Sequence, residues 1–188
     1  MEGCVDLGVS KYYLNLFSPA TYSAFLESDK TITGFSIAQR GKAQKIKSGD
    51  WFICYCTKVS RFFGLLEVKD TLFIDDKPIF TPQNDPFVVR FKVNPKILLP
   101  VKQSLPIKDD NIWKELSFTR DTEKKRTQTW AYNLQGSLSK FNDKDSKILV
   151  AKLISQQQNP RKYDFDEKIF NKYKNSPMKR ADDNVVKA

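Results

Sequence analysis

The sequence predicts an α+β protein, a small mixed β-barrel flanked by short helices. Short runs of aromatic and β-branched residues alternate along the chain with segments whose apolar residues recur at helical spacing. Turn-rich stretches such as 75–86 separate these runs. The 188 residues suffice for one well-buried domain but not comfortably for two, and 40% of them are hydrophobic, as in globular proteins.

Local signals define the first elements. Residues 11–17, KYYLNLF, are aromatic and apolar and predict a strand. Ser18-Pro19 is typical of a helix N-cap followed by proline at the first position, and three apolar residues then share one helical face. A short segment, 31–36, is punctuated by glycine, and residues 40–46 predict one or two turns of basic helix.

Two apolar strands, 51–57 and about 63–72, form the predicted centre of the sheet. The loop between them is unusual because it combines cations with aromatics: Lys58, Arg61, Phe62 and Phe63. Cations beside aromatics at a strand end are what a stacked base and its phosphate require. Because neighbouring residues in a strand alternate, we expect either Phe62 or Phe63 to face solvent and to be the main stacking residue.

The second half of the chain contains one further long strand and two predicted helices. Strict alternation over 87–93 predicts a half-exposed strand with Arg90 on its outer face, continuing to Leu99. Asp109 caps a short helix that runs to Leu116, and 143–157 has a single apolar stripe typical of a packed helix. We expect a domain over 1–158, a C-terminal extension over 159–174 with room for a docked helix, and a disordered tail over 175–188.

The composition argues against several function classes. The chain has no histidine, which excludes Ser-His-Asp and Cys-His catalysis and most zinc hydrolase sites. It also lacks a phosphate-binding P-loop and a Gly-x-Gly-x-x-Gly motif. Cys54 and Cys56 share one face of a strand and are interpreted as small buried apolar residues. We therefore expect a non-enzyme with no catalytic residues, no metal and no cofactor.

The net charge of +10 predicts an anionic partner. The charge is concentrated in two internal segments, since residues 38–61 hold six cations against one acid and residues 119–140 hold five against two. A basic face is therefore expected rather than a basic tail. No run of about 18 apolar residues and no signal peptide occur, so we expect no membrane partner and a cytoplasmic location.

Several motifs, in order along the chain, resemble those of the EVE domain, one of the PUA-like barrels that include the YTH readers of methylated adenine. Residues 13–17 resemble the opening strand of the family, and Gly34-Phe-Ser36 resembles the segment that returns to the pocket. Lys45-Ile-Lys-Ser-Gly-Asp50 resembles the entry to a core strand, and Ser60-Arg-Phe-Phe-Gly64 with Leu65-Leu-Glu-Val68 resembles the returning strand. Further similarity over 87–100, 119–121 and 130–141 extends the match to about residues 11–158.

The resemblance implies a PUA-like barrel that binds DNA or RNA and takes one modified, for example methylated, base into an aromatic pocket. It also implies an association with restriction or RNA-processing proteins. The expected base pocket consists of Asn15, Phe17, Phe35, Ser36, Ile37, Tyr55, Phe62, Phe63 and Trp130. The expected phosphate contacts are Arg40, Lys42, Lys45, Lys58, Arg61, Arg120, Lys124 and Arg126. Ser36 stands where YTH domains place a cage tryptophan.

Several residues have an alternative, structural interpretation. Phe17 and Tyr55 are equally compatible with the core, and Arg61 can hold its loop instead of binding phosphate. Arg120 can pair locally with Asp121, and Trp130 is either a lid on the pocket or a plug of the barrel end.

Two other functions remain open at this point. One is an RNA-processing enzyme of the PUA-like ASCH type that uses Tyr55, Lys58 and Glu67 in the same cleft. The other is a protein-interaction module whose charge serves another acidic surface.

Overall fold

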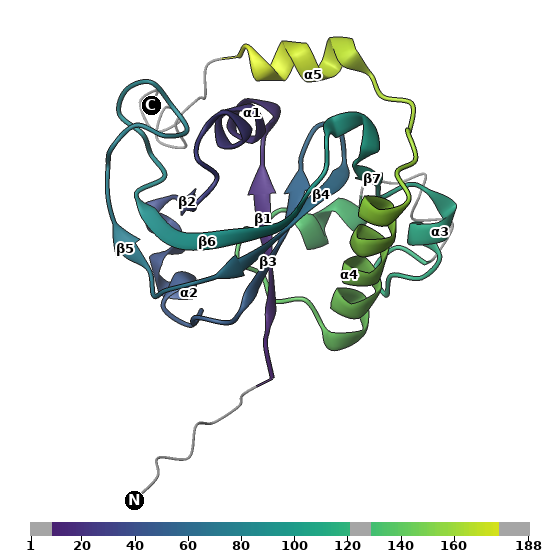
Figure 1. Ribbon diagram of the computed structural model, residues 1–188, viewed down its shortest axis with the longest axis horizontal. Coiled ribbons are helices and arrows are strands. Elements are labelled where there is room, and N and C mark those ends of the chain that lie inside the picture. The colour runs from purple at the N-terminus through teal and green to yellow at the C-terminus, as the bar shows by residue number, and fades with distance from the viewer. Residues whose placement is uncertain (1–8, 121–128, 177–188) are drawn as a thin grey trace, which may run out of the picture.

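A curled mixed sheet organises the computed structural model, which describes residues 9–120 and 129–176 (Figure 1). Its main path has the order β1 (Tyr12–Phe17), β3 (Trp51–Cys56), β4 (Arg61–Val68), β6 (Val89–Leu98) and β2 (Ile32–Phe35). β1 runs parallel to β3, while the other pairs are antiparallel. Two short strands extend it, β5 (Phe73–Ile74) beside β6 and β7 (Leu105–Pro106) beside β4.

Helices cover both faces of this sheet (Figure 1). One side carries α1 (Pro19–Glu27), the 3-10 turn η1 (Ile37–Gln39) and α2 (Arg40–Ala43). The other side carries α3 (Asp110–Trp113), η4 (Thr129–Leu134) and α4 (Asp143–Gln158), and η2 (Val101–Gln103) follows β6. The predicted α+β class, with a small mixed barrel-like sheet and flanking helices, is confirmed.

The caps that the sequence indicated are present. Ser18 accepts a hydrogen bond from the backbone N–H of Thr21, whose hydroxyl accepts from the Ser18 N–H in return, and Pro19 begins α1. Asp109 caps α3, which ends at Trp113 instead of Leu116. Each cap satisfies N–H groups that have no partner inside the helix.

The C-terminal extension forms the helix α5 (Glu167–Lys174), which packs against α1 at one end of the sheet (Figure 1). Phe170 enters the core beside Tyr22, with ring centroids 6.0 Å apart. The division of the chain at residue 158 stays a prediction, and the expected tail beyond 176 lies outside the described residues.

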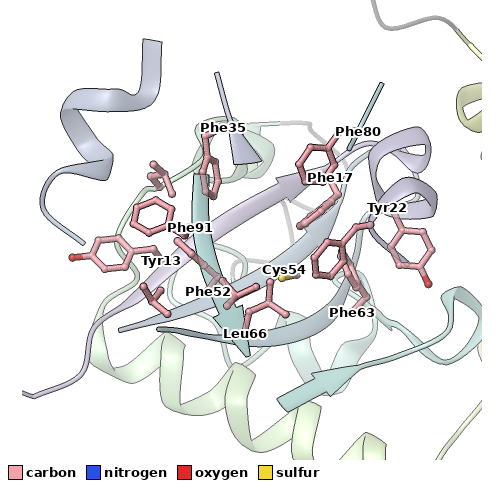
Figure 2. Packing of buried hydrophobic residues seen from close by; sticks show 14 of the residues in the cluster. Tyr13, Phe17, Tyr22, Phe35, Phe52, Cys54, Phe63, Leu66, Phe80 and Phe91 are labelled. Carbon is pink, nitrogen blue, oxygen red and sulfur yellow. The ribbon is translucent and has the colours of Figure 1, made fainter. Parts of the chain in front are cut away.

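The buried apolar residues form two clusters, one on each face of the sheet. The inner cluster lies between the curled sheet and α1 and contains most of the phenylalanines, including Phe52 and Phe91 (Figure 2). The outer cluster packs the opposite face against α3, η4 and α4 and contains Trp113 and Trp130. Because both faces of β3 and β4 are covered, these strands have near-continuous apolar sequences.

Alternation along β3 assigns its side chains to the two clusters. Phe52, Cys54 and Cys56 belong to the inner cluster, while Ile53 and Tyr55 belong to the outer one. Cys54 and Cys56 are buried free thiols, as the sequence predicted, and burial raises the pKa of Cys56 to about 12.

The prediction that Arg90 lies on an exposed face of β6 is wrong. Its side chain has no solvent exposure, because the loop between β5 and β6 folds over it. The guanidinium donates to the carboxylates of Asp75 (2.7 Å) and Asp85 (3.4 Å) and to the carbonyls of Lys77 and Phe87. Arg90 is therefore the hydrogen-bonded centre of the β5–β6 loop.

Asp85 completes this network from the loop side. Its carboxylate, itself without solvent exposure, accepts hydrogen bonds from the backbone N–H groups of Ile79, Phe80 and Phe87. Two charges removed from water are tolerated when they face each other and their remaining donors and acceptors are paired. The pair with Arg90 thus determines the course of residues 75–87.

No helix in the described ranges is long and apolar enough to span a membrane.

Replacing Asp85 by alanine should lower the free energy of unfolding by about 3–5 kcal/mol, because it leaves the buried Arg90 charge without its fully buried partner. Urea unfolding measures the change. Glu67→Ala is the control, since it removes a carboxylate whose partners Lys69 and Lys96 are exposed and should cost less than about 1 kcal/mol. Equal losses for both variants would contradict this role of the pair.

The Asp75 carboxyl should make stability depend on pH. The backbone N–H of Lys77 and the Arg90 guanidinium hold its pKa below the usual aspartate value. A pKa lowered by folding stabilises the protein above the unfolded-state pKa, and this contribution is lost on acidification below about pH 5. Asp75→Asn should therefore be less stable than the wild-type protein at neutral pH, and the difference in stability should shrink as the pH falls. Thermal unfolding at several pH values measures this difference. A deficit that stays the same at all pH values would contradict this contribution of Asp75.

Candidate nucleic-acid interface

The end strands β1 and β2 face each other across a seam. The side chains at this seam are joined by a buried hydrogen bond, in which Asn15 Nδ2 donates to Thr33 Oγ1 at 2.8 Å. Next to it lies a hollow, the seam hollow, lined by Leu16, Phe17, Thr21, Gly34, Phe80 and Phe87. Its volume of about 10 Å³ leaves room for about one water molecule.

The β5–β6 loop closes the seam hollow with two aromatic rings. Phe80 and Phe87 meet edge-on with their ring centroids 5.6 Å apart, and Phe80 lies beside Phe17 (Figure 2). Both rings belong to the loop that Arg90 and Asp85 hold in place. The walls of the hollow are thus aromatic on the loop side and on the β1 side.

Gly34 permits the loop to approach β2 this closely. A Cβ at this position would lie 2.7 Å from the carbonyl oxygen of Phe87 and 2.8 Å from the ring of Phe80, closer than real Cβ contacts allow. The motif Gly34-Phe35-Ser36 therefore has a packing requirement at its first residue.

Exposed cations border the seam. η1 and α2 follow β2 directly; Arg40 and Lys42 of α2 and Lys45 in the turn after it are exposed, and we call these three residues the basic border. Within the described ranges none of these three has an ion-pair partner.

The segment 136–141 connects the basic border to the edge of β1. It runs along that edge through hydrogen bonds from Leu14 N to the Ser139 carbonyl (2.9 Å) and from Leu16 N to Ser137 Oγ (3.3 Å). A Cβ on Gly136 would lie 3.6 Å from the Lys42 ammonium. Seam hollow, edge segment and basic border are therefore contiguous.

The structure brings one group of the expected pocket residues together around the seam. Asn15 and Phe17 lie on the same face of β1, as the alternation predicted, and Phe35 packs in the inner cluster against Phe52 and Phe91. Ser36 is half-buried at the end of β2, and Ile37 is 58% exposed.

A second group lies on the opposite face of the sheet and does not meet the first. Tyr55, Phe62 and Trp130 belong to the outer cluster. Trp130 contacts Trp113 edge-on at 5.5 Å, so it is no lid on the seam hollow. Burial raises the pKa of the Tyr55 phenol, which stays protonated at neutral pH.

The expectation that Phe62 or Phe63 faces solvent is wrong, because both side chains have no solvent exposure. They do alternate, but each enters a cluster. Phe63 packs edge-on against Tyr22 (4.6 Å) and Phe17 (5.2 Å), whereas Phe62 lies 4.9 Å from Tyr55. The physical reason is that β4 begins at Arg61, inside the doubly covered part of the sheet.

The other expected phosphate contacts that the structure describes do not line the seam hollow. Arg61 is buried, and its guanidinium donates to the carbonyls of Val101, Ser104 and Asp164, so it joins segments of the chain. Lys58 is exposed in the β3–β4 turn, and Arg120 is exposed after α3. Lys124 and Arg126 lie outside the described residues, as does Asp121, the alternative partner of Arg120.

Sequence reasoning missed Phe80 and Phe87 as site residues. They enclose the polar turn residues 81–86, and an aromatic residue at each end of this segment was the available signal. Among the described residues, no cluster of histidine, cysteine or carboxylate side chains has the size of a metal site.

No family model matches the sequence. Nor does any curated protein sequence match it. Assignment to the EVE domains in particular therefore stays a prediction.

Solved structures, in contrast, do resemble this chain. The YTH domain of Zygosaccharomyces rouxii MRB1, solved in complex with N6-methyladenosine RNA, has a TM-score of 0.54 at 12% identity, over 78% of this chain and 88% of that one. The Pho92 YTH domain in complex with m6A has a TM-score of 0.56 at 9% identity, over 85% and 93%. The Mmi1 YTH domain in complex with RNA has a TM-score of 0.53 at 12% identity, over 82% and 84%. At such identities the likeness concerns the fold, and the chain has a YTH-like, PUA-like fold.

Proposed function

We propose that this protein is a non-enzymatic nucleic-acid reader that takes a modified base of a single strand into the seam between β1 and β2. The observation that carries the proposal is the seam hollow, where Phe17, Phe80 and Phe87 adjoin an exposed basic border. The YTH neighbours that were solved with N6-methyladenosine RNA or RNA support RNA and a methylated base as the ligand. The resemblance to EVE domains adds a restriction or RNA-processing protein as a partner.

Aromatic walls supply the binding energy that such a reader needs. Extruding a base costs a few kcal/mol, and stacking on aromatics returns about 1–3 kcal/mol per base. The seam hollow, at about 10 Å³, has room for about one water molecule. A base therefore enters when the half-buried ring of Phe87 turns outward, while Arg90 and Asp85 keep the loop backbone in place, and this ring then stacks on the base.

The basic border supplies contacts that do not depend on the base. Arg40, Lys42 and Lys45 are exposed, and Lys42 approaches Gly136 of the segment along the edge of β1, so we assign the backbone of a bound strand to this border. Their positive charge attracts phosphates and releases counterions on binding.

The geometry gives little support to the alternative of an RNA-processing enzyme. Tyr55 and Glu67 lie towards opposite ends of the β3–β4 ladder, since Tyr55 pairs with Phe62 and Glu67 with Trp51. Glu67 is engaged by Lys69 and Lys96 at the surface. Labelled RNA should therefore stay intact during long incubation without added metal, and cleavage would reinstate the enzyme.

A methylated single-stranded RNA should bind more tightly than the same strand without the methyl group, and Phe87→Ala should weaken the methylated complex by about 1–3 kcal/mol because stacking is removed. Fluorescence anisotropy titrations at physiological salt measure both. The matched control is Phe73→Ala, which removes a half-buried ring from β5 that does not line the seam hollow. Equal affinity of the wild-type protein for the two strands would exclude the reader.

Lys42→Ala should weaken binding to methylated and plain strands alike, because a phosphate contact carries no base information. The slope of log affinity against log salt should become shallower by about 0.7, the contribution of one neutralised phosphate on a single strand. Lys147→Ala is the control, because it changes an exposed lysine of α4, which packs on the opposite face of the sheet from α2. This variant should leave the slope unchanged. A protein-interaction module would instead show no steep salt dependence with nucleic acid.

A further inference from the structure

A second and larger hollow lies where the C-terminal extension crosses the β3–β4 turn. It has a volume of about 220 Å³, and we call it the strap hollow. Its lining consists of Lys58, Val59 and Arg61 from the turn and the start of β4, and of Asp164, Phe165, Asp166 and Ile169 from the extension. At about 220 Å³ it is smaller than the roughly 300–1,000 Å³ pockets of drug-sized ligands, so it suits part of a nucleotide, such as its base or its sugar phosphate.

The walls of the strap hollow are held in place from both sides. The buried Arg61 donates to the Asp164 carbonyl, and the Tyr163 N–H donates to the Lys102 carbonyl at 2.9 Å. Lys102 also forms an ion pair with Glu167 at 2.6 Å. Beyond the hollow, Phe170 anchors α5 in the inner cluster. A site with fixed walls loses little conformational entropy when a ligand binds.

The lining offers all three kinds of contact that a nucleotide uses. The Lys58 ammonium is an exposed donor and a positive charge, and it lies 5.0 Å from the centroid of the Tyr173 ring. The Asp164 carboxylate and Oδ2 of Asp166 are acceptors suited to sugar hydroxyls or base N–H groups, while Asp166 Oδ1 caps α5 by accepting from the Ile169 N–H at 3.0 Å. Phe165 and Ile169 provide apolar surface for a base or sugar face.

The strap hollow also lies next to the seam through β1. The Phe17 carbonyl accepts hydrogen bonds from both the N–H (2.8 Å) and the hydroxyl (3.1 Å) of Thr57, the residue before Lys58. Phe17 itself lines the seam hollow. The two hollows are thus connected through Phe17, the last residue of β1, and Thr57, the residue before Lys58.

We propose that the strap hollow binds a nucleotide flanking the base in the seam, with Lys58 contacting its phosphate and the two aspartates its sugar or base. This inference rests on the proposed nucleic-acid reader and adds a second contact to the same strand. It commits to a strand of nucleic acid, so a free mononucleotide is a competing occupant that the test separates.

Lys58→Asn is a suitable test because Lys58 has a left-handed backbone with φ of 66°, a conformation that asparagine tolerates well. Affinity for a plain single-stranded RNA should fall, and the log–log salt slope should become shallower by about 0.7. Lys30→Asn is the matched control, since Lys30 also has a left-handed φ, of 64°, and lines neither hollow. It should leave the slope unchanged, and an unchanged slope for Lys58→Asn as well would overturn the proposal.

A second pair of variants tests the extension side. Ile169→Glu places an acid at the rim of the strap hollow, whereas Ile154→Glu makes the same change at an isoleucine of α4 with nearly the same exposure, 41% against 40%. The first should weaken RNA binding clearly more than the second, through repulsion of the phosphate. Equal losses of affinity in the two variants would indicate a general effect of charge and would contradict RNA binding at the strap hollow.

The failure of this inference is distinguishable from failure of the proposed reader. If the wild-type protein binds methylated and plain RNA equally well, the proposed reader function is wrong. Lys58→Asn, in contrast, should leave the ratio of the two affinities unchanged. A third measurement is the binding of adenosine monophosphate to the wild-type protein and to Lys58→Asn. If the mononucleotide binds the wild-type protein in a manner that depends on Lys58 while RNA binding does not, the hollow is a free-nucleotide site and the strand contact is wrong.

Discussion

The candidate site depends on one interaction, the buried ion pair between the Arg90 guanidinium and the Asp85 carboxylate. The guanidinium emerges from β6 opposite Gly34 of β2 and joins three parts of the β5–β6 loop through Asp75, Lys77 and Asp85. Asp85 in turn orders the N–H groups of Phe80 and Phe87. A loop of turn residues would otherwise follow the surface; here it carries two aromatic rings across the seam. The same ion pair that stabilises the loop thereby shapes the wall of the seam hollow.

Coverage of both sheet faces has a second consequence, since it divides the aromatic residues into two sets. Phe17 and Phe63 enter the inner cluster, while Tyr55 and Phe62 enter the outer one. Two rings adjacent in sequence are therefore separated by the sheet itself. The sheet therefore keeps Tyr55 and Phe62 apart from the rings that line the seam hollow, Phe17, Phe80 and Phe87.

The C-terminal extension packs on the β3–β4 turn and on Arg61 at the start of β4, and it thereby separates the roles of two cations. Arg61 is used by the protein itself, because a buried guanidinium must be satisfied and three nearby carbonyls do so. Lys58 remains exposed at the rim of the strap hollow. Arg61 thus has a structural role because it is buried, whereas Lys58 is accessible to a ligand because it is exposed.

Much of the fold could be predicted from local sequence. The capping signal of Ser18-Pro19, the central strand β3 and the helix α4 are each determined by neighbours within a few residues. The same is true of the shared face of Asn15 and Phe17 and of the burial of Cys54 and Cys56, since alternation in a strand is a local rule. The second central strand was also predicted, but β4 runs over Arg61–Val68 instead of 63–72.

Only the tertiary structure decided which face each residue meets and what covers it. Alternation correctly separated Phe62 from Phe63 but could not show that both faces are covered, because α1 and α4 reach β4 from distant parts of the chain. Nor could it show that Arg90 is buried under a loop, or that Phe80 and Phe87 pack on Gly34. The sequence by itself thus determined the main strands and helices, the basic segments and the likeness to a PUA-like barrel. The place of the candidate site follows from long-range contacts, which no local pattern encodes.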